Sequence, residues 1–336
     1  MLDGAGTGRP GISLQLNPEG ACAAGIEVGV EQLSVIAIDL VGQVIYRKRQ
    51  GYTSTEPSAV IAQIYEEVAL LQQALRHRGT CLGLGITIPG ILSEEGEILL
   101  APNLGWRNYP IRKQLGQLPL PFKLENDANA SALGEYYFGE THHNLLFVLL
   151  DVGIGGGYLV HGAVQRGSSG AALEIGHLQL DPQGPLCGCG RRGCLEAIAG
   201  RRALLKKYQE AGGGQGLEAL VADLSSGRAS ALRIVQEWAQ FLAEALVSLV
   251  NVLNPEHLLI GGSLAPLIPF VEPLLQQKLS LRLPGNEQLK FSISKLGDDA
   301  AAMGGAALIY QDLFRLEEVS AEETYRPKAQ AFLART

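Results

Sequence analysis

The chain has 336 residues, which at roughly 150 residues per domain is enough for about two domains. With 46% hydrophobic and 18% charged residues, its composition excludes a disordered protein. The net charge of −7 does not suit a DNA-binding surface, and no apolar run reaches the roughly 18–20 residues of a membrane span. The N-terminus has no apolar signal core, so we expect a soluble, cytoplasmic protein that binds no membrane.

The first third of the chain predicts a linker-like arm followed by a β-β-β-α-β unit. Residues 1–23 are rich in Gly and Pro and hold at most one short strand, Ile12 to Leu16. A helix capped by Thr55 and ended by Gly79 is expected, because apolar residues recur there at helical spacing. The expected strands, of which the first three form an antiparallel meander, are Ala24 to Val30, Leu33 to Asp39, Gln43 to Arg47 and Leu82 to Thr87.

The rest of the chain repeats this pattern in outline. After a strand, Phe122 to Leu124, an Ala-rich helix is expected to end near Phe138. A second strand set is interrupted by a tight glycine turn, Asp151 to Gly157. The remaining expected elements are strands Leu145 to Leu150, Tyr158 to Val160 and His257 to Ile260, and helices Ala229 to Leu253 and Ala300 to Leu313.

These elements predict an α/β protein of two lobes with a central cleft, and such clefts usually bind small molecules. We expect the N-terminal lobe to span residues 24–125 and the C-terminal lobe, which holds the cysteine-rich loop, residues 126–299. Residues 300–336 contain a C-terminal helix that is expected to pack back on the N-terminal lobe.

The cysteine-rich loop predicts a zinc site. His177, Cys187, Cys189 and Cys194 have the spacing H-x9-C-x-C-x4-C, and one imidazole with three thiolates can close a tetrahedral structural site. The alternative is a set of free buried thiols beside a core histidine. Because four protein ligands leave no open position for water, the ion is expected to hold the loop and not to take part in catalysis.

Polar residues near this loop form a candidate sugar site, since polyols are recognised by carboxylates and amides that bind adjacent hydroxyls. Asn126 or Asp127 could instead cap the following helix, and Glu196 could face the dipole of a helix that begins near Leu195. The candidates are Asn103, Asn126, Asp127, Glu174, His177 and Glu196.

Glycine turns form a weaker candidate for phosphate binding, because backbone amides in such turns can cradle an anion. The first turn, which follows an apolar strand, contains Gly153 and Gly155 to Gly157; Gly261-Gly262 is weaker still. Glycine turns also serve ordinary hairpins.

Together these residues resemble the ROK family, named for repressor, open reading frame and kinase. The resemblance covers nearly the whole chain and is carried by Glu174-Ile175-Gly176-His177, the segment Cys187 to Glu196, Glu125-Asn126-Asp127, Pro102 to Trp106 and Ile154 to Gly157. It implies an actin-like, ribonuclease-H-like duplicated fold, a structural zinc, usually a homodimer, and a sugar ligand contacted by the six candidates above. In ROK sugar kinases the residue matching Asp127 is the base that deprotonates the attacking sugar hydroxyl, and ATP with Mg²⁺ is the phosphoryl donor.

The stretches that match the kinase phosphate loops depart from the kinase pattern. Where a kinase has Asp-Ile-Gly-Gly-Thr-Lys, this chain has Glu27 to Gln32, in which only Gly29 is kept. Val30 replaces a glycine, and Glu31 places a carboxylate where a hydroxyl would meet phosphate, which repels the anion. Val152 replaces a threonine in the second loop, where Gly153, Gly155, Gly156 and Gly157 remain. These losses are serious because phosphoryl transfer depends on positioning and charge neutralisation.

The leading hypothesis is therefore a sugar-binding effector domain of a ROK-type transcriptional regulator. The segment from Gly8 to Pro18 resembles the linker that joins such domains to a helix-turn-helix, and we expect this chain to lack that DNA reader and not to bind DNA alone. The alternative is an ATP-dependent sugar or amino-sugar kinase with Asp127 as base. A zinc-stapled scaffold without ligand is disfavoured by the carboxylates expected near the cleft.

Overall fold

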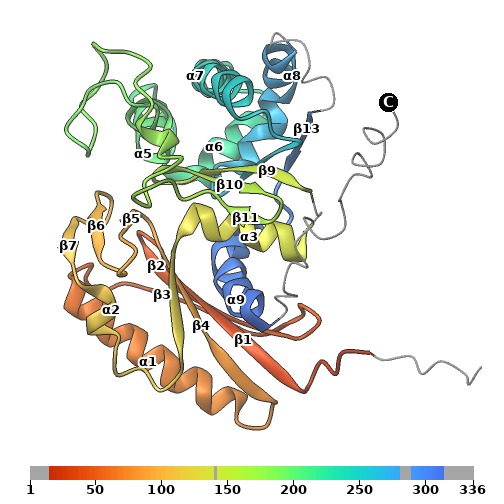
Figure 1. Ribbon diagram of the computed structural model, residues 1–336. Helices are drawn as coiled ribbons and strands as arrows, with labels where there is room; N and C mark the ends of the chain where they lie inside the picture. Colours follow the sequence, from red (N-terminus) through yellow and green to blue (C-terminus); the bar gives the residue numbers. More distant parts are fainter. Residues whose placement is uncertain (1–14, 140–141, 281–288, 314–336) are drawn as a thin grey trace, which may run out of the picture.

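The computed structural model describes residues 15–139, 142–280 and 289–313. It shows two α/β lobes, each built on a five-stranded sheet, with two helices between the sheets (Figure 1). This is the duplicated architecture that the sequence predicts. Of the expected strand Ile12 to Leu16, residues 12–14 lie outside the described residues, and Gln15 and Leu16 are not in a strand.

The sheet of the first lobe has the order β3-β2-β1-β4-β8. Strands β1 to β3 form the expected antiparallel meander, whereas β4 and β8 join it in parallel. Helix α1 covers one face, and its apolar stripe packs on Ile26 and Leu84. The bounds are β1 Ala21–Val28, β2 Gln32–Asp39, β3 Val44–Gly51, α1 Pro57–Leu75, β4 Thr80–Ile88 and β8 Phe122–Asn126.

The predicted Thr55 cap of the first helix is wrong. Helix α1 begins at Pro57, and its N-cap residue, Glu56, makes no side-chain capping hydrogen bond. The carbonyl oxygen of Thr55 instead accepts a hydrogen bond of 2.8 Å from Nε1 of Trp106. This contact ties the start of α1 to a small antiparallel sheet that the sequence did not predict, formed by β5 Ile91–Leu92, β6 Ile98–Ala101 and β7 Trp106–Tyr109 and followed by α2 Ile111–Gln114.

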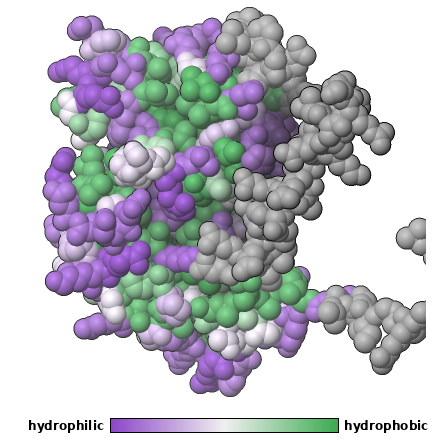
Figure 2. All heavy atoms as spheres, in the orientation of Figure 1, coloured by the Kyte–Doolittle hydropathy of each residue, from purple (hydrophilic) through white to green (hydrophobic). Residues whose placement is uncertain are grey.

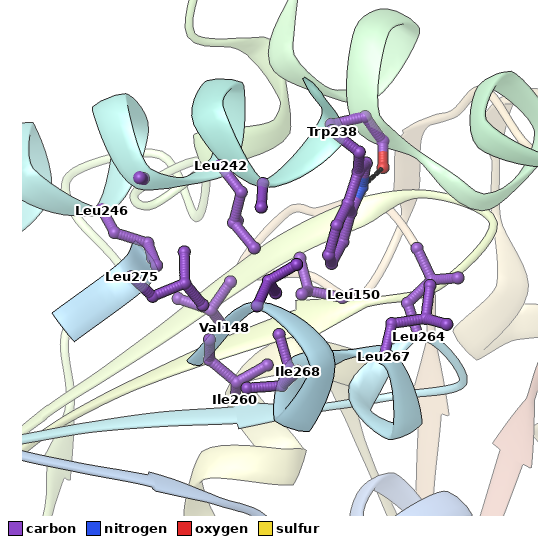
Figure 3. Close-up of a cluster of buried hydrophobic side chains, with 14 of the residues drawn as sticks. Val148, Leu150, Trp238, Leu242, Leu246, Ile260, Leu264, Leu267, Ile268 and Leu275 are labelled. Atoms are coloured by element: carbon purple, nitrogen blue, oxygen red, sulfur yellow. Dashed lines mark hydrogen bonds between the residues drawn. The ribbon is translucent and has the colours of Figure 1, made fainter. Parts of the chain in front are cut away.

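The sheet of the second lobe has the order β11-β10-β9-β12-β13. Its outer face packs against α7 and α8 through a core in which Leu150, Trp238 and Ile260 meet (Figure 3). The bounds are β9 Asn144–Leu150, β10 Ile154–Val160, β11 Ala163–Val164, α4 Leu195–Ala199, α5 Arg201–Glu210, α6 Gly216–Ser225, α7 Ala229–Leu253, β12 His257–Gly261, α8 Ile268–Leu279 and β13 Lys290–Ile293, with 3₁₀ turns Ile175–His177, Ala265–Leu267 and Gly297–Asp299.

Helices α3 Asp127–Phe138 and α9 Ala300–Leu313 form the layer between the two sheets (Figure 1). On one side α9 buries Ala302, Met303 and Tyr310 against Ile36 and Ile38 of the first sheet. On the other side both helices contribute to a core with β9, β10 and β12 of the second sheet. The C-terminal helix therefore packs on both lobes, and both sheets present their strand ends to a common cleft.

The predicted glycine turn over Asp151 to Gly157 is wrong in extent. The turn is confined to Asp151 to Gly153, and the remaining glycines lie in β10, paired with β9. They are explained by packing: a Cβ at Gly157 would lie 2.4 Å from the carbonyl oxygen of Ala128, so α3 can cross β10 only over glycine.

None of the described helices is long and apolar enough to cross a membrane.

Candidate functional site

Two adjoining cavities lie between the lobes. The first encloses about 740 Å³ of space, which includes open solvent at its mouth, and is lined by residues of both lobes. On the face shown in Figure 2, hydrophilic side chains gather between the two lobes beside hydrophobic ones. The first cavity brings together every sugar-binding candidate that the sequence predicted: Asn103, Asn126, Asp127, Glu174, His177 and Glu196.

Asn126 and Asp127 enter the cavity at the junction of β8 and α3. Oδ1 of Asn126 accepts a hydrogen bond of 3.0 Å from the amide of Asn129, so Asn126 caps α3. Its Nδ2 donates to the carbonyl oxygen of Gly90 at 3.1 Å. Asp127 is not the cap; its Oδ1 accepts from the neighbouring Ala128 amide at 2.8 Å. The capping alternative therefore holds for Asn126, and Asp127 lines the cavity beside it.

Glu174 and His177 are positioned by one 3₁₀ turn, Ile175–His177. The turn is preceded by Leu173, whose φ of 61° is uncommon for a residue other than glycine. The spacing of three residues puts both side chains on one side of the turn, with Nε2 of His177 4.0 Å from Oε2 of Glu174. The turn thus presents an imidazole and a carboxylate side by side to the cavity.

Glu196 closes the cavity from the second lobe, in the first turn of α4. Its Oε2 accepts hydrogen bonds from the Ile154 amide at 3.2 Å and from Nδ2 of Asn103 at 3.4 Å. The carboxylate therefore joins α4 to β10 and to the small sheet of the first lobe. Nε1 of Trp238 holds the end of α4 by donating to the carbonyl oxygen of Ala199 at 2.7 Å (Figure 3).

Burial and mutual repulsion raise the pKa of three carboxyl groups in the cavity. Burial is the main cause of a pKa of about 6 for Asp127, with Asp151 and Glu196 adding to it. The pKa of Glu174 rises to about 7 and that of Glu27 to about 8, again chiefly through burial, with Asp127 contributing to both. At neutral pH the cavity therefore offers both protonated carboxyls, which donate, and ionised ones, which accept.

The geometry of the cysteine-rich loop matches the metal ligands that the sequence predicts. Ligand atoms of His177, Cys187, Cys189 and Cys194 lie within 4.8 Å of one another, so the cluster could hold a metal ion. Nδ1 of His177 is 3.6 Å from Sγ of Cys187, and Sγ of Cys189 is 3.8 Å from Sγ of Cys194. A tetrahedral zinc with the usual bond lengths would separate sulfur from nitrogen by about 3.6 Å and two sulfurs by about 3.8 Å.

The backbone of this loop brings the sulfurs together. A tight turn is closed by hydrogen bonds from the Cys187 amide to the Arg191 carbonyl oxygen at 2.7 Å and from the Gly190 amide to the Cys187 carbonyl oxygen at 2.9 Å. His177 belongs to both sites, because its Nδ1 faces the sulfurs while its Nε2 faces Glu174 and the cavity. A metal on Nδ1 would fix the imidazole so that the cavity sees a single nitrogen.

The second cavity, of about 780 Å³, is lined by the residues that the sequence assigned to altered phosphate loops: Gly29, Val30, Glu31 and Val152. Nη2 of Arg201, at the start of α5, lies 2.7 Å from Oε2 of Glu31, and its Nε lies 3.6 Å from Oδ1 of Asp151. Of the glycines given to these loops, Gly153, Gly155 and Gly156 line the first cavity and Gly29 lines both, but Gly157 is not among the lining residues.

Sequence reasoning gave no role to the side chains of three charged residues of the cleft: Glu27 and Asp151, which begin the two predicted phosphate loops, and Arg201. Glu27 and Asp151 line both cavities, and Oδ1 of Asp151 also accepts a hydrogen bond of 2.6 Å from Ser263. The position of Glu27 and Asp151 at the ends of two buried strands was a usable signal. Arg201 had none, because its partners Glu31 and Asp151 lie far from it in the sequence.

Comparisons with known proteins agree with this geometry. The model of the ROK family matches residues 23–312. The chain is 30% identical to a xylose repressor of Caldicellulosiruptor bescii, over 93% of this chain and 84% of that protein. It is 29% identical to a glucokinase of Halalkalibacterium halodurans, over 88% of this chain and 96% of that one.

Solved structures of both kinds are similar to this chain. A ROK family transcriptional regulator, a homologue of the E. coli MLC protein, superposes with a TM-score of 0.80 at 28% identity, covering 91% of this chain and 81% of that one. A ROK family glucokinase from Streptomyces griseus, in complex with glucose and AMPPNP, superposes with a TM-score of 0.76 at 25% identity, covering 86% and 99%.

Proposed function

Because the chain belongs to the ROK family, we propose that it is the sugar-binding effector region of a transcriptional regulator and that it carries a structural zinc. The observation that carries the proposal is the contrast between the two cavities. The first keeps a full set of polar groups suited to a sugar, whereas the second is lined by acidic groups where the family resemblance locates nucleotide phosphates.

The charges of the second cavity oppose a triphosphate. Glu31, Asp151 and Asp298 line it, and Arg201 is its one Lys or Arg among the described lining residues. That cation is already paired with Glu31 and Asp151. A nucleotide entering the cavity would have to compete with Glu31 and Asp151 for Arg201, and its phosphates would meet an excess of carboxylates, which costs electrostatic free energy.

The first cavity favours a neutral ligand with several hydroxyl groups. None of its described lining residues is Lys or Arg, and it contains five carboxyl groups, so an anionic ligand such as a sugar phosphate would be repelled. Carboxyl groups that exist in both protonation states near neutral pH can donate to and accept from adjacent hydroxyls. We therefore propose an uncharged sugar, contacted by Asp127, Glu174 and His177, as the ligand; xylose and glucose are the first candidates, because similar proteins are named for them.

Zinc would be held by His177, Cys187, Cys189 and Cys194. Its role is structural: it fixes the loop that follows the 3₁₀ turn and thereby the imidazole of His177 in the sugar cavity. We further propose a homodimer as the working form and expect this region alone not to bind DNA specifically, since its net charge is −7.

A sugar kinase is the second candidate. It is favoured by Asp127, whose pKa of about 6 suits a general base, and by the similarity to glucokinases. In this function Asp127 would take the proton of the attacking sugar hydroxyl, and ATP with Mg²⁺ would occupy the second cavity. The same carboxylate can serve a regulator as a plain hydrogen-bond acceptor, so the second cavity decides between the two.

The proposal is tested by titration calorimetry of the zinc-loaded protein with xylose, glucose, N-acetylglucosamine and glucose 6-phosphate, with and without ATP and magnesium. Binding of a neutral sugar, unchanged by ATP and absent for the sugar phosphate, supports the effector function. Saturable binding of ATP that strengthens with sugar supports the kinase, and binding of none of the neutral sugars contradicts both.

A further inference from the structure

Two cysteines outside the zinc loop lie directly opposite each other in the first sheet. Cys22 of β1 and Cys81 of β4 are register partners in a parallel pairing. Adjacent strands are roughly 4.7–4.9 Å apart, which is within the span of roughly 4.4–6.8 Å that a disulfide allows between Cα atoms. Both are free thiols in this structure.

The two side chains also share a face of the sheet. Both belong to the core beneath α1, near Leu75 at the last turn of that helix. Cys22 is buried at 1% exposure, whereas Cys81 is half-buried, so a small reagent can reach the second thiol before the first. The register of β1 against β4 shifts just after this pair, which marks a local irregularity where the backbone can adjust.

The surroundings of the two thiols distinguish an attacking thiol from a resolving one. The Cys81 thiol donates to the carbonyl oxygen of Gly83 at 3.8 Å. The neighbouring Cys22 lowers the pKa of Cys81, whereas the neighbouring Cys81 and burial raise the pKa of Cys22. The thiolate is the nucleophilic form of cysteine. Cys81 is therefore the more reactive and the more exposed of the two, and Cys22 is its register partner on the adjacent strand.

We propose that Cys22 and Cys81 form a redox-active pair that hydrogen peroxide converts to a disulfide between β1 and β4. The Cys81 thiolate attacks a peroxide oxygen; the S–O bond forms, the O–O bond breaks, and the leaving hydroxide takes a proton to become water. The Cys22 sulfur then attacks the Cys81 sulfur; the S–S bond forms, the S–O bond breaks, and the hydroxide leaves as water with the Cys22 proton. Two thiols are oxidised by two electrons, and one peroxide is reduced to two waters.

The disulfide would act on the segment that enters β1. A Cβ at Gly79, just before β4, would lie 2.3 Å from the carbonyl oxygen of Glu19 and 2.4 Å from Gly20, so the chain before β1 already touches the start of β4. A covalent link between Cys22 and Cys81 would join the same two segments. The disulfide would thus fasten the start of β1 to the start of β4, several residues along the strands from Glu27, which lines the cleft and is the register partner of Thr87.

The experiment is mass-spectrometric mapping of the zinc-loaded, full-length protein after treatment with hydrogen peroxide. Trypsin separates the two thiols, because Arg47 and Arg78 lie between them, and each resulting peptide contains a single cysteine. The expected product is a cross-link between the Cys22 and Cys81 peptides that dithiothreitol removes. The internal comparison is the oxidation of the three thiols of the predicted zinc site, Cys187, Cys189 and Cys194. Their peptides differ in mass from the cross-linked pair and are counted separately.

Cys22→Ala is the informative variant, because it removes the resolving thiol and leaves the attacking one. With dimedone present during peroxide treatment, this variant is expected to accumulate the adduct of a sulfenic acid at Cys81, whereas Cys81→Ser gives neither adduct nor cross-link. A circular dichroism melt checks that each variant folds. The proposal is wrong if peroxide leaves both thiols of the wild-type protein free for alkylation, or if wild type accumulates a dimedone adduct at Cys81 without the cross-link. Both results are obtained with wild-type protein, so they hold even if a variant fails to fold.

Discussion

Nη2 of Arg201 lies 2.7 Å from Oε2 of Glu31, and this ion pair joins the two lobes across the second cavity. Arg201 begins α5 in the second lobe, and Glu31 lies between β1 and β2 in the first. The backbone amide of Arg201 also donates to the carbonyl oxygen of Asp151 at 2.9 Å, which fixes the base of the side chain. The ion pair therefore links the two lobes across the cavity that we propose to correspond to the phosphate site of ROK kinases.

We expect a modest, salt-dependent contribution of this pair to stability. In a double-mutant cycle with Glu31→Gln and Arg201→Gln, the coupling in unfolding free energy should be about 0.2–1 kcal/mol, since the Glu31 side chain is 66% exposed. Urea titrations at low and high salt measure it, and the coupling should shrink at high salt. The exposed pair Lys206–Glu210 is a suitable comparison within one helix. A coupling near zero at low salt would show that the lobes are not joined by this contact.

The parts of the fold that the sequence predicted well are those with long periodic patterns. The helix expected over Ala229 to Leu253 has these bounds in the structure, because 25 residues of amphipathic repeat leave little room for another reading. The short strands β5 to β7 have two to four residues and carry no such pattern. The sequence predicts a turn over Gly155 to Gly157 because it does not show that α3 needs glycine in the strand beneath it.

The candidate site also has parts that the sequence predicts and parts that it does not. The cysteine spacing and the motifs around Asp127 and Glu174 are local signals. The cavity contains Asp127, Glu174 and His177, and the three cysteines lie next to it in the cluster around His177. The role of Asn126 as a cap and of Asp127 as the cavity-facing residue depends on one turn of backbone, which spacing does not resolve. Arg201 and Glu31 meet only through the packing of the two lobes, so their ion pair could not be read from either segment alone.

We predict one zinc ion per chain in protein purified without chelator. Cys189→Ser should lose most of the metal and lower the melting temperature, because a site that forms on folding contributes its binding free energy to stability. Elemental analysis and a thermal melt measure the two effects. Cys81→Ser, outside the cluster, is the matched control and should keep its zinc. Wild-type protein without zinc, or a Cys189→Ser variant that retains it fully, would contradict the assignment.

Asp127→Asn should weaken sugar binding by about 1.5–3 kcal/mol, or about ten- to 150-fold in Kd, because it removes a charged acceptor. Titration calorimetry with the sugar that binds wild type most tightly gives this value. Asp298→Asn is the control, since Asp298 lines the second cavity and not the first. Equal losses in the two variants would mean that the sugar does not lie in the first cavity.

The carboxyl groups of the first cavity predict that stability falls as pH rises. Folding raises the pKa of Glu27 from 4.5 to about 8, so the folded protein keeps a proton that the unfolded chain releases above about pH 4.5. The unfolding free energy should therefore fall between about pH 4.5 and pH 8, where the folded state binds more protons. Asp127 and Glu174, with pKa values of about 6 and 7, act in the same direction.

Glu27→Gln tests this directly. In urea unfolding between pH 5 and pH 9, the unfolding free energy of the variant should fall less with rising pH than that of wild type. At pH 9 the variant should be more stable than wild type. Glu210→Gln, exposed on α5, is the control and should follow wild type. A Glu27→Gln variant with the same pH dependence as wild type would show that Glu27 is ionised in the folded protein throughout this range.

The central claim, that the chain binds a sugar without phosphorylating it, is tested most directly by a coupled assay of ADP release. The assay contains magnesium, ATP and a sugar at a concentration that calorimetry shows to saturate the protein. Val30, Glu31 and the pairing of Arg201 predict no release above that of the Asp127→Asn variant, because no phosphoryl group is positioned for the hydroxyl that Asp127 could deprotonate. Turnover of about 1–100 per second that Asp127→Asn abolishes would contradict the account and identify the protein as a sugar kinase.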